Sequence, residues 1–180
     1  QTFASTFVEK NVSTTAPSIS APAYIVINAT NHHIYASKDM NVKYEPAGLA
    51  NLMTAYLATQ FFSFDKVLTV NKTAVTGVDK DASIAALDVG DKITLYDALA
   101  SMFIKGCVDS ANVVAENVSG SIDEFVNLMN DTARSLGLTN SIFMNPSGIN
   151  NAAQLISPLD MAIVMSKVCE NKELVDSDND

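Results

Sequence analysis

At 180 residues, 48% of them hydrophobic and 17% charged, the chain is long enough to bury a core and has the composition of a globular protein rather than a disordered one. Its formal net charge of −9 argues against nucleic acid and anionic lipid as partners, because neither attracts an acidic protein. No apolar run approaches the roughly 18 residues that a membrane-spanning helix needs. We therefore expect neutral or basic partners.

The N-terminal part of the sequence predicts an extended lead-in and then a β-hairpin. Residues 1–16 are rich in Ser, Thr and Ala without a long periodic pattern, which indicates an extended segment, although residues 3–8 could pack as a short helix. Two β-rich runs, 23–28 and 33–37, flank a polar turn. Such a pair predicts a hairpin.

The remainder of the sequence is mainly helical. After Pro46, apolar residues recur at spacings of three and four, which indicates a buried helix. Capping signals open later helices, for example where Asp97 follows Thr94 three residues on. The predicted helices span 46–62, 95–105, 109–118, 122–136 and 158–169. The predicted short strands are 66–70 and a pair within 84–93 that turns at 89–91.

Neither the cysteines nor the histidines form a metal-ligand pattern. Cys107 and Cys169 lie in apolar helical patterns and are expected to be buried free thiols, although a disulfide between them stays open. His32 and His33 are adjacent, so on a strand they would point to opposite faces, and we expect surface or turn positions for both. The carboxylates between residues 79 and 91 are scattered, which favours turns over a metal site. No cofactor is implied.

Five strings occur in the same order and at similar intervals as in the serine-type D-alanyl-D-alanine carboxypeptidases, which are low-molecular-mass penicillin-binding proteins of the peptidase S11 family. They are Pro17-Ser-Ile-Ser-Ala, Pro46-Ala-Gly-Leu-Ala-Asn-Leu-Met-Thr-Ala-Tyr, Val89-Gly-Asp, Leu136-Gly-Leu-Thr-Asn-Ser and Phe143-Met-Asn-Pro-Ser-Gly. The resemblance covers about residues 17–170. It implies an α+β, mainly helical fold of the β-lactamase and DD-peptidase type, incomplete here, with an N-terminal hairpin and a helical cluster. Residues 171–180 would be an acidic tail.

Two catalytic motifs of that family match positions of this chain that lack the required side chains. In the first, Ser-x-x-Lys, the family uses Ser as nucleophile and Lys as base, and Gly48 and Asn51 stand here. Glycine has no side chain that could attack, and asparagine is no base near neutral pH. In the second, Ser-x-Asn, the matching residues are Gly106 and Val108, followed by Asp109, which does match the family.

The third motif, Lys-Thr-Gly, occurs nowhere in the 180 residues. In the family it comes after the segment that matches 158–169, and we expect the chain to stop before that point. The resemblance thus implies that no catalytic residue is intact. Cys107, Asp109 and Asn145 would belong to a vestigial cleft, with Cys107 as the one residual candidate nucleophile.

The leading hypothesis from the sequence is a catalytically inactive homologue that serves as a binding or scaffolding module at the bacterial cell envelope, outside the cytoplasm. Its partner would be a peptidoglycan peptide or an envelope protein. One alternative is an active serine-type carboxypeptidase that acts on peptidoglycan stem peptides through other residues. A second is a half-domain completed by a partner chain, because the hairpin would lack a central strand. We expect its edge to be covered by the N-terminal segment, by a second copy in a homo-oligomer, or by a separate polypeptide.

Overall fold

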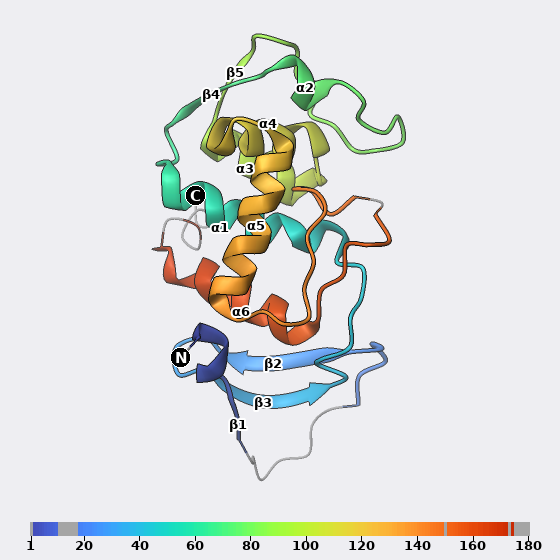
Figure 1. Cartoon of the computed structure of the whole chain (residues 1–180), viewed down its shortest axis with the longest axis vertical. Helices are drawn as coiled ribbons and strands as arrows, with labels where there is room; N and C mark the ends of the chain where they lie inside the picture. Colours follow the sequence, from blue (N-terminus) through green and yellow to red (C-terminus); the bar gives the residue numbers. More distant parts are fainter. Residues whose placement is uncertain (1, 11–17, 150, 173, 175–180) are drawn as a thin grey trace. The chain divides into compact units, whose positions relative to one another are not determined.

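The computed structural model describes residues 2–10, 18–149, 151–172 and 174, and it divides the chain into two compact units (Figure 1). Unit 1 comprises Gln1–Tyr44, Thr132–Ile142 and Leu155–Asp180, and unit 2 comprises Glu45–Asp131 and Phe143–Gln154. No helix of the described residues is long and apolar enough to cross a membrane.

The sheet of unit 1 confirms the predicted hairpin. Strands β2 (Tyr24–Asn28) and β3 (His33–Lys38) pair antiparallel, and β1 (Val8–Glu9) pairs parallel with β3, so that the order is β1-β3-β2. The N-terminal segment therefore covers the β3 edge, which is one of the three expected arrangements. The short helix considered for residues 3–8 forms as the 3₁₀ helix η1 (Phe3–Thr6). Residues 11–16 of the lead-in lie outside the described residues.

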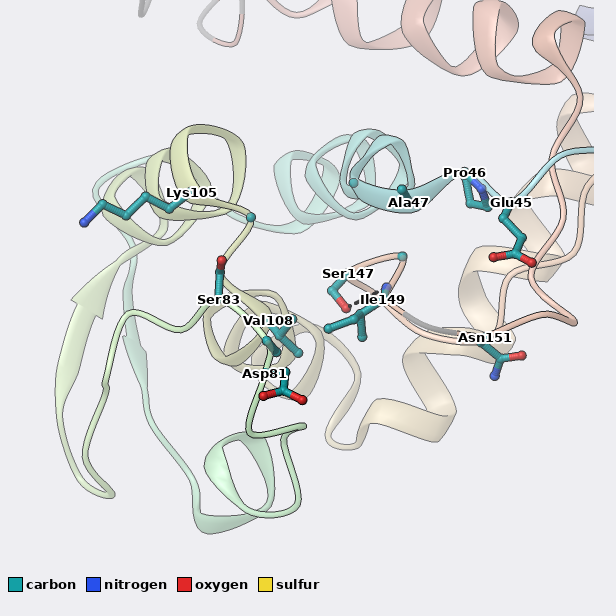
Figure 2. A pocket seen from close by; sticks show the side chains of 14 residues that line it. Glu45, Pro46, Ala47, Asp81, Ser83, Lys105, Val108, Ser147, Ile149 and Asn151 are labelled. Carbon is teal, nitrogen blue, oxygen red and sulfur yellow. Dashed lines mark hydrogen bonds between the residues drawn. The ribbon is translucent and has the colours of Figure 1, made fainter. Parts of the chain in front are cut away.

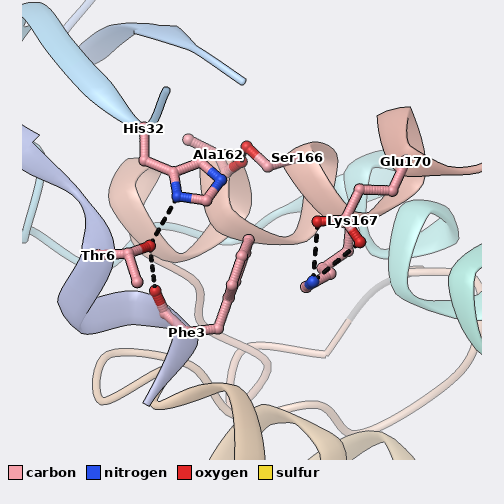
Figure 3. Close-up of polar contacts among 7 residues, drawn as sticks. All are labelled: Phe3, Thr6, His32, Ala162, Ser166, Lys167 and Glu170. Atoms are coloured by element: carbon pink, nitrogen blue, oxygen red, sulfur yellow. Dashed lines mark hydrogen bonds and ion pairs between the residues drawn. The ribbon is translucent and has the colours of Figure 1, made fainter. Parts of the chain in front are cut away.

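Aromatic and cationic contacts attach η1 to the hairpin turn and to the C-terminal helix of the same unit (Figure 3). His32 lies in the turn, as expected, but it is half-buried: its ring centroid is 4.9 Å from that of Phe3 and its Nδ1 is 2.8 Å from Thr6 Oγ1. Lys167 Nζ lies 3.7 Å from the centroid of the Phe3 ring and 2.8 Å from Glu170 Oε1. These contacts position the segment that continues into β1.

The second large element of unit 1 is α6 (Pro158–Glu170), which packs on β2. Ser157 caps it, since the Ser157 hydroxyl accepts a hydrogen bond from the Asp160 amide, and this confirms the predicted helix start. Cys107, in unit 2, is buried as expected, whereas the expectation for Cys169 is wrong: it is free and exposed near the end of α6. Apolar residues of α6 occur on most sides of the helix, so their periodicity did not indicate which side faces the core.

Unit 2 is a helical cluster. It contains η2 (Ala47–Ala50), α1 (Asn51–Phe61), α2 (Lys72–Val75), α3 (Leu95–Lys105), α4 (Val108–Ser119) and α5 (Ile122–Leu136) up to Asp131. Helices α1, α3 and α4 pack against one another. Fully buried side chains such as Met53, Leu95, Met102, Val113 and Phe125 form the core. The predicted helices are confirmed, except that the first begins as a 3₁₀ turn.

The predicted strand pair within residues 84–93 is wrong. Strand β5 (Lys92–Thr94) pairs antiparallel with β4 (Val67–Thr69), while residues 84–88 form a loop. The amides of Ala85 and Leu87 donate hydrogen bonds to the carboxylate of Asp109 and not to a neighbouring strand. A long-range side-chain contact therefore replaces the expected strand pairing.

Candidate functional site

Unit 2 contains a cavity of about 370 Å³ where segments distant in the sequence meet (Figure 2). Three of the four motif positions that lack the family's side chains line it: Gly48, Gly106 and Val108. Ser83 and Ser147 contribute hydroxyls to the same lining. The two matched motifs are thus adjacent in space, as the resemblance implies for a family cleft.

The two positions that match the first motif differ in their surroundings: Gly48 is open to solvent, and Asn51 is hydrogen-bonded to α3. Gly48 is exposed, and a Cβ added to it would meet no atom within 4 Å. Asn51, the first residue of α1, is 3% exposed, and its Nδ2 donates to the carbonyl of Met102 at 3.3 Å near the end of α3. Its Oδ1 is buried without a hydrogen-bond partner among the described residues. At the position of the family's base there is therefore a structural amide.

Gly106 has become a helix cap. It ends α3 in the left-handed region with φ of 68°, and its amide donates to the Met102 carbonyl at 3.0 Å. Glycine adopts this conformation without the steric cost that a Cβ brings. Val108, the other position of this motif, is apolar, and its amide donates to the Ser83 carbonyl at 2.9 Å. Neither position offers a hydroxyl or an amide side chain to a substrate.

Cys107, between these two residues, is a poor nucleophile. It is 1% exposed and does not line the cavity. Burial raises the pKa of the Cys107 thiol, and the negative charge of Asp109 raises it further, while Lys105 and a hydrogen bond with Ser101 act in the opposite direction. The thiol is therefore protonated at neutral pH, whereas the thiolate is the reactive form.

Asp109, the residue that matches the family, holds one wall of the cavity. It is 2% exposed, and its carboxylate accepts hydrogen bonds from the amides of Ala85 at 2.9 and 3.1 Å, Leu87 at 3.3 Å and Ser110 at 2.9 Å. The loop that carries Ser83 is thereby fastened to the start of α4. Asp109 does not itself line the cavity, so we describe it as a positioning residue.

Asn145 does not line the cavity itself but holds the loop that supplies Ser147, Gly148 and Ile149 to the lining. Its Oδ1 accepts from the Gly148 amide at 2.7 Å, and its Nδ2 donates to the Ile149 carbonyl at 2.8 Å. Gly148 has φ of +82°, and a Cβ added there would overlap the carbonyl oxygen of Ala47. The loop after Asn145 thus lies directly against η2. Sequence reasoning missed Ser147 as a lining residue, although its string was recognised, and it had no signal for Ser83.

Two helix serines outside the cavity lining, Ser101 and Ser110, lie close together. Ser101 Oγ and Ser110 Oγ are 2.7 Å apart, but Ser101 also donates to the Ala98 carbonyl and Ser110 is fully buried. Within the part of the chain that the structure describes, no group of three or more His, Cys, Asp or Glu side chains could hold a metal ion.

Comparison with known proteins gives consistent matches. The family model for D-alanyl-D-alanine carboxypeptidases, peptidase S11, matches residues 10–176. The D-alanyl-D-alanine carboxypeptidase DacC of Escherichia coli is 31% identical over 170 residues, which are 90% of this chain and 42% of the relative. DacF of Bacillus subtilis is 28% identical over 156 residues, 86% of this chain and 40% of the relative.

Solved structures agree. The D-alanyl-D-alanine carboxypeptidase DacD of Francisella tularensis superposes with a TM-score of 0.80 at 25% identity, over 91% of this chain and 41% of that one. Penicillin binding protein 6B of Escherichia coli, at 23% identity, shares the fold with a TM-score of 0.84 over 93% of this chain and 56% of its own. The chain spans about two fifths of the length of these curated relatives. It belongs to the D-alanyl-D-alanine carboxypeptidase family, peptidase S11, and has the α+β, mainly helical fold of the matched part.

Proposed function

We propose that this chain is a catalytically inactive member of the family that acts as a binding module. The proposal rests on one observation: the motif side chains are replaced, while a residue that holds the cavity wall is retained. Gly48, Asn51, Gly106 and Val108 lack the side chains that the two motifs require, while Asp109 still fastens a wall of the cavity beside them. Removing the nucleophile or the base of a serine hydrolase lowers kcat by about 10⁶-fold, and both are replaced at the matched positions here.

The ligand proposed for the cavity is a peptidoglycan peptide or a segment of an envelope protein. Family membership supports this choice, because the relatives are named for action on D-alanyl-D-alanine. The module would then work outside the cytoplasm of a bacterium. Its net charge of −9 is compatible with a neutral or basic partner.

A fluorescent penicillin tests the inactive state. We expect no covalent label on this chain under conditions in which the related DacC is labelled, and no release of D-alanine from a model pentapeptide above a heat-treated sample. A variant in which Ser83, Ser147 and Cys107 are all replaced by Ala provides the matched control. Stable labelling that this variant abolishes would favour the alternative of an active serine-type or thiol-type enzyme.

A second candidate function, a half-domain completed by a partner chain, rests on β2. Tyr24, Ile25, Val26 and Ile27 are consecutive apolar residues, and Val26 is 45% exposed. Continuous apolar runs are typical of strands covered on both faces and paired on both sides. Among the described residues, however, β2 is an edge strand of the order β1-β3-β2.

Light scattering coupled to size exclusion tests whether a second copy of the chain completes the sheet at the β2 edge. We expect a concentration-dependent dimer that Val26→Lys abolishes, because an inward or central charge on an edge strand blocks pairing. Val42→Lys, a change of another exposed valine outside the sheet, is the control. A strictly monomeric chain at all concentrations would leave only a separate polypeptide as the partner.

A further inference from the structure

Helix α3 of unit 2 has a second apolar side that faces solvent. A surface helix normally carries one apolar stripe, directed toward the core. In α3 the buried stripe consists of Leu95, Ala98, Leu99 and Met102. A second set, which we call the outer stripe, follows the spacing i, i+4, i+7 and i+8 of one helix side and consists of Tyr96, Ala100, Phe103 and Ile104. Tyr96 and Phe103 are each 47% exposed and Ile104 is 80% exposed.

The outer stripe is continuous along the helix. The Phe64 ring approaches its N-terminal end, with the Phe64 and Tyr96 centroids 6.2 Å apart, whereas Ile104 at the other end remains open. Single exposed apolar residues are ordinary on protein surfaces, but a contiguous set marks a contact site. The outer stripe therefore has the properties of an interaction surface.

The charged residues of α3 indicate which partner fits the outer stripe. Asp97 lies in the first turn of the helix and Lys105 in the last. Neither has an ion-pair partner among the residues that the structure describes, and the Lys105 side chain extends away from the other labelled residues (Figure 2). A partner helix of one charge sign would complement only one end. A second α3 in the antiparallel direction places Asp97 of each copy beside Lys105 of the other, whereas a parallel copy would place like charges together.

We infer that the outer stripe of α3 binds the same stripe of a second copy of this chain, with the two helices antiparallel about a twofold axis. The axis passes near Ser101, midway between Asp97 and Lys105 and next to Ala100, so small side chains lie where the helices come closest. The inference goes beyond the proposed binding function, because it concerns a surface and not the cavity. Lys105 also lines the cavity, so the second copy lies at the cavity rim. The helix has 11 residues, and so small a contact is typical of a weak, reversible dimer.

Sedimentation equilibrium over a wide range of concentrations measures the association. We expect a monomer–dimer equilibrium for the parent chain. Ile104→Ser should raise the dissociation constant about tenfold or more, because the change removes an apolar contact twice in a symmetric dimer. Val89→Ser, at a 60% exposed position outside α3, is the matched control and should leave the constant unchanged. Both positions are exposed, so the fold should tolerate each change.

Exchanged charges test the antiparallel direction. Asp97→Lys and Lys105→Asp each bring like charges together at both ends of the pair, so neither variant should dimerise alone. A mixture of the two variants restores opposite charges at both ends and should form a heterodimer. Asp97 also accepts a hydrogen bond from Thr94 at the cap of α3, so circular dichroism checks that each variant keeps its helices. Two folded variants that stay monomeric when mixed contradict the antiparallel pairing.

The Val26→Lys variant separates this contact from pairing at the β2 edge. A dimer through the outer stripe persists in that variant, whereas a dimer through β2 is lost. A parent chain that is monomeric at every concentration, or a dimer that Ile104→Ser leaves unchanged, overturns the inference. Neither result affects the proposed inactive state, which the fluorescent penicillin tests separately.

Discussion

Gly148 gives the sharpest test of the architecture around the cavity. Its φ of +82° almost equals the +83° of Gly120, so alanine at either position meets the same left-handed backbone. That conformation costs a residue with a Cβ about 1–2 kcal/mol, which the lower entropy of the unfolded chain offsets in part. At Gly120 nothing lies within 4 Å of the added Cβ, and we expect Gly120→Ala to lower the free energy of unfolding by about 1 kcal/mol.

Gly148→Ala adds a steric conflict that a change of rotamer does not relieve. The new Cβ would overlap the carbonyl oxygen of Ala47 and lie 2.6 Å from its carbonyl carbon. If Gly148 and Ile149 shift away from Ala47 while Asn145 stays in place, the loop loses the hydrogen bond from the Gly148 amide to Asn145 at 2.7 Å and the one from Asn145 to Ile149 at 2.8 Å. Two such bonds contribute about 1–3 kcal/mol together. With the backbone cost of about 1 kcal/mol expected at Gly120, the total loss is then about 2–4 kcal/mol.

Urea denaturation followed by circular dichroism measures both variants against the parent chain. In a thermal melt, each kcal/mol corresponds to a shift in Tm of about 2–4 °C for a protein of this size. The Tm of Gly148→Ala should therefore lie well below that of Gly120→Ala. If the two variants agree within about 0.5 kcal/mol, the close approach of the loop to η2 is not present in solution, and the reasoning about this wall of the cavity fails.

Three further predictions concern the buried carboxylates and the thiols. Asp109→Ala leaves the amides of Ala85 and Leu87 without their acceptor and should lower the free energy of unfolding by about 2–4 kcal/mol. Asp97→Ala removes only the exposed hydrogen bond that the Asp97 carboxylate accepts from the Thr94 hydroxyl and should cost about 1 kcal/mol. Equal losses in urea denaturation would contradict the positioning role. A thiol reagent should modify the exposed Cys169 within minutes and the buried Cys107 only after unfolding, and two rapidly reacting thiols would refute the burial of Cys107. Burial raises the pKa of Asp160, while hydrogen bonds from Ser141 and Asn140 and the charge of Lys43 oppose the shift. The folded state therefore binds this proton more tightly than the unfolded state, and the contribution of Asp160 to stability falls as pH rises from about 4. The stability of Asp160→Asn relative to the parent should increase between pH 4 and 7, and a constant or decreasing difference in urea denaturation would contradict the raised pKa.

The sequence by itself determined where several helices begin and which residues stand at the matched motif positions. Thr94 and Ser157 accept hydrogen bonds from amides only three residues ahead, so the starts of α3 and α6 follow from neighbouring residues. The identity of Gly48 and Asn51 at the matched motif positions likewise requires no coordinates, because a side chain that is absent supplies no nucleophile in any fold.

Only the tertiary structure decided what the residues at and beside the motif positions contact. Asp109 fastens a loop that lies 22 to 24 positions earlier, and this contact overrides the strand pattern of that loop. Asn51 reaches the carbonyl of Met102, which is 51 positions away, so the side chain at this matched motif position makes a structural hydrogen bond. Periodicity and capping describe neighbours along one helix or strand, whereas these contacts depend on how segments distant in the sequence pack together. The cavity is a consequence of that packing.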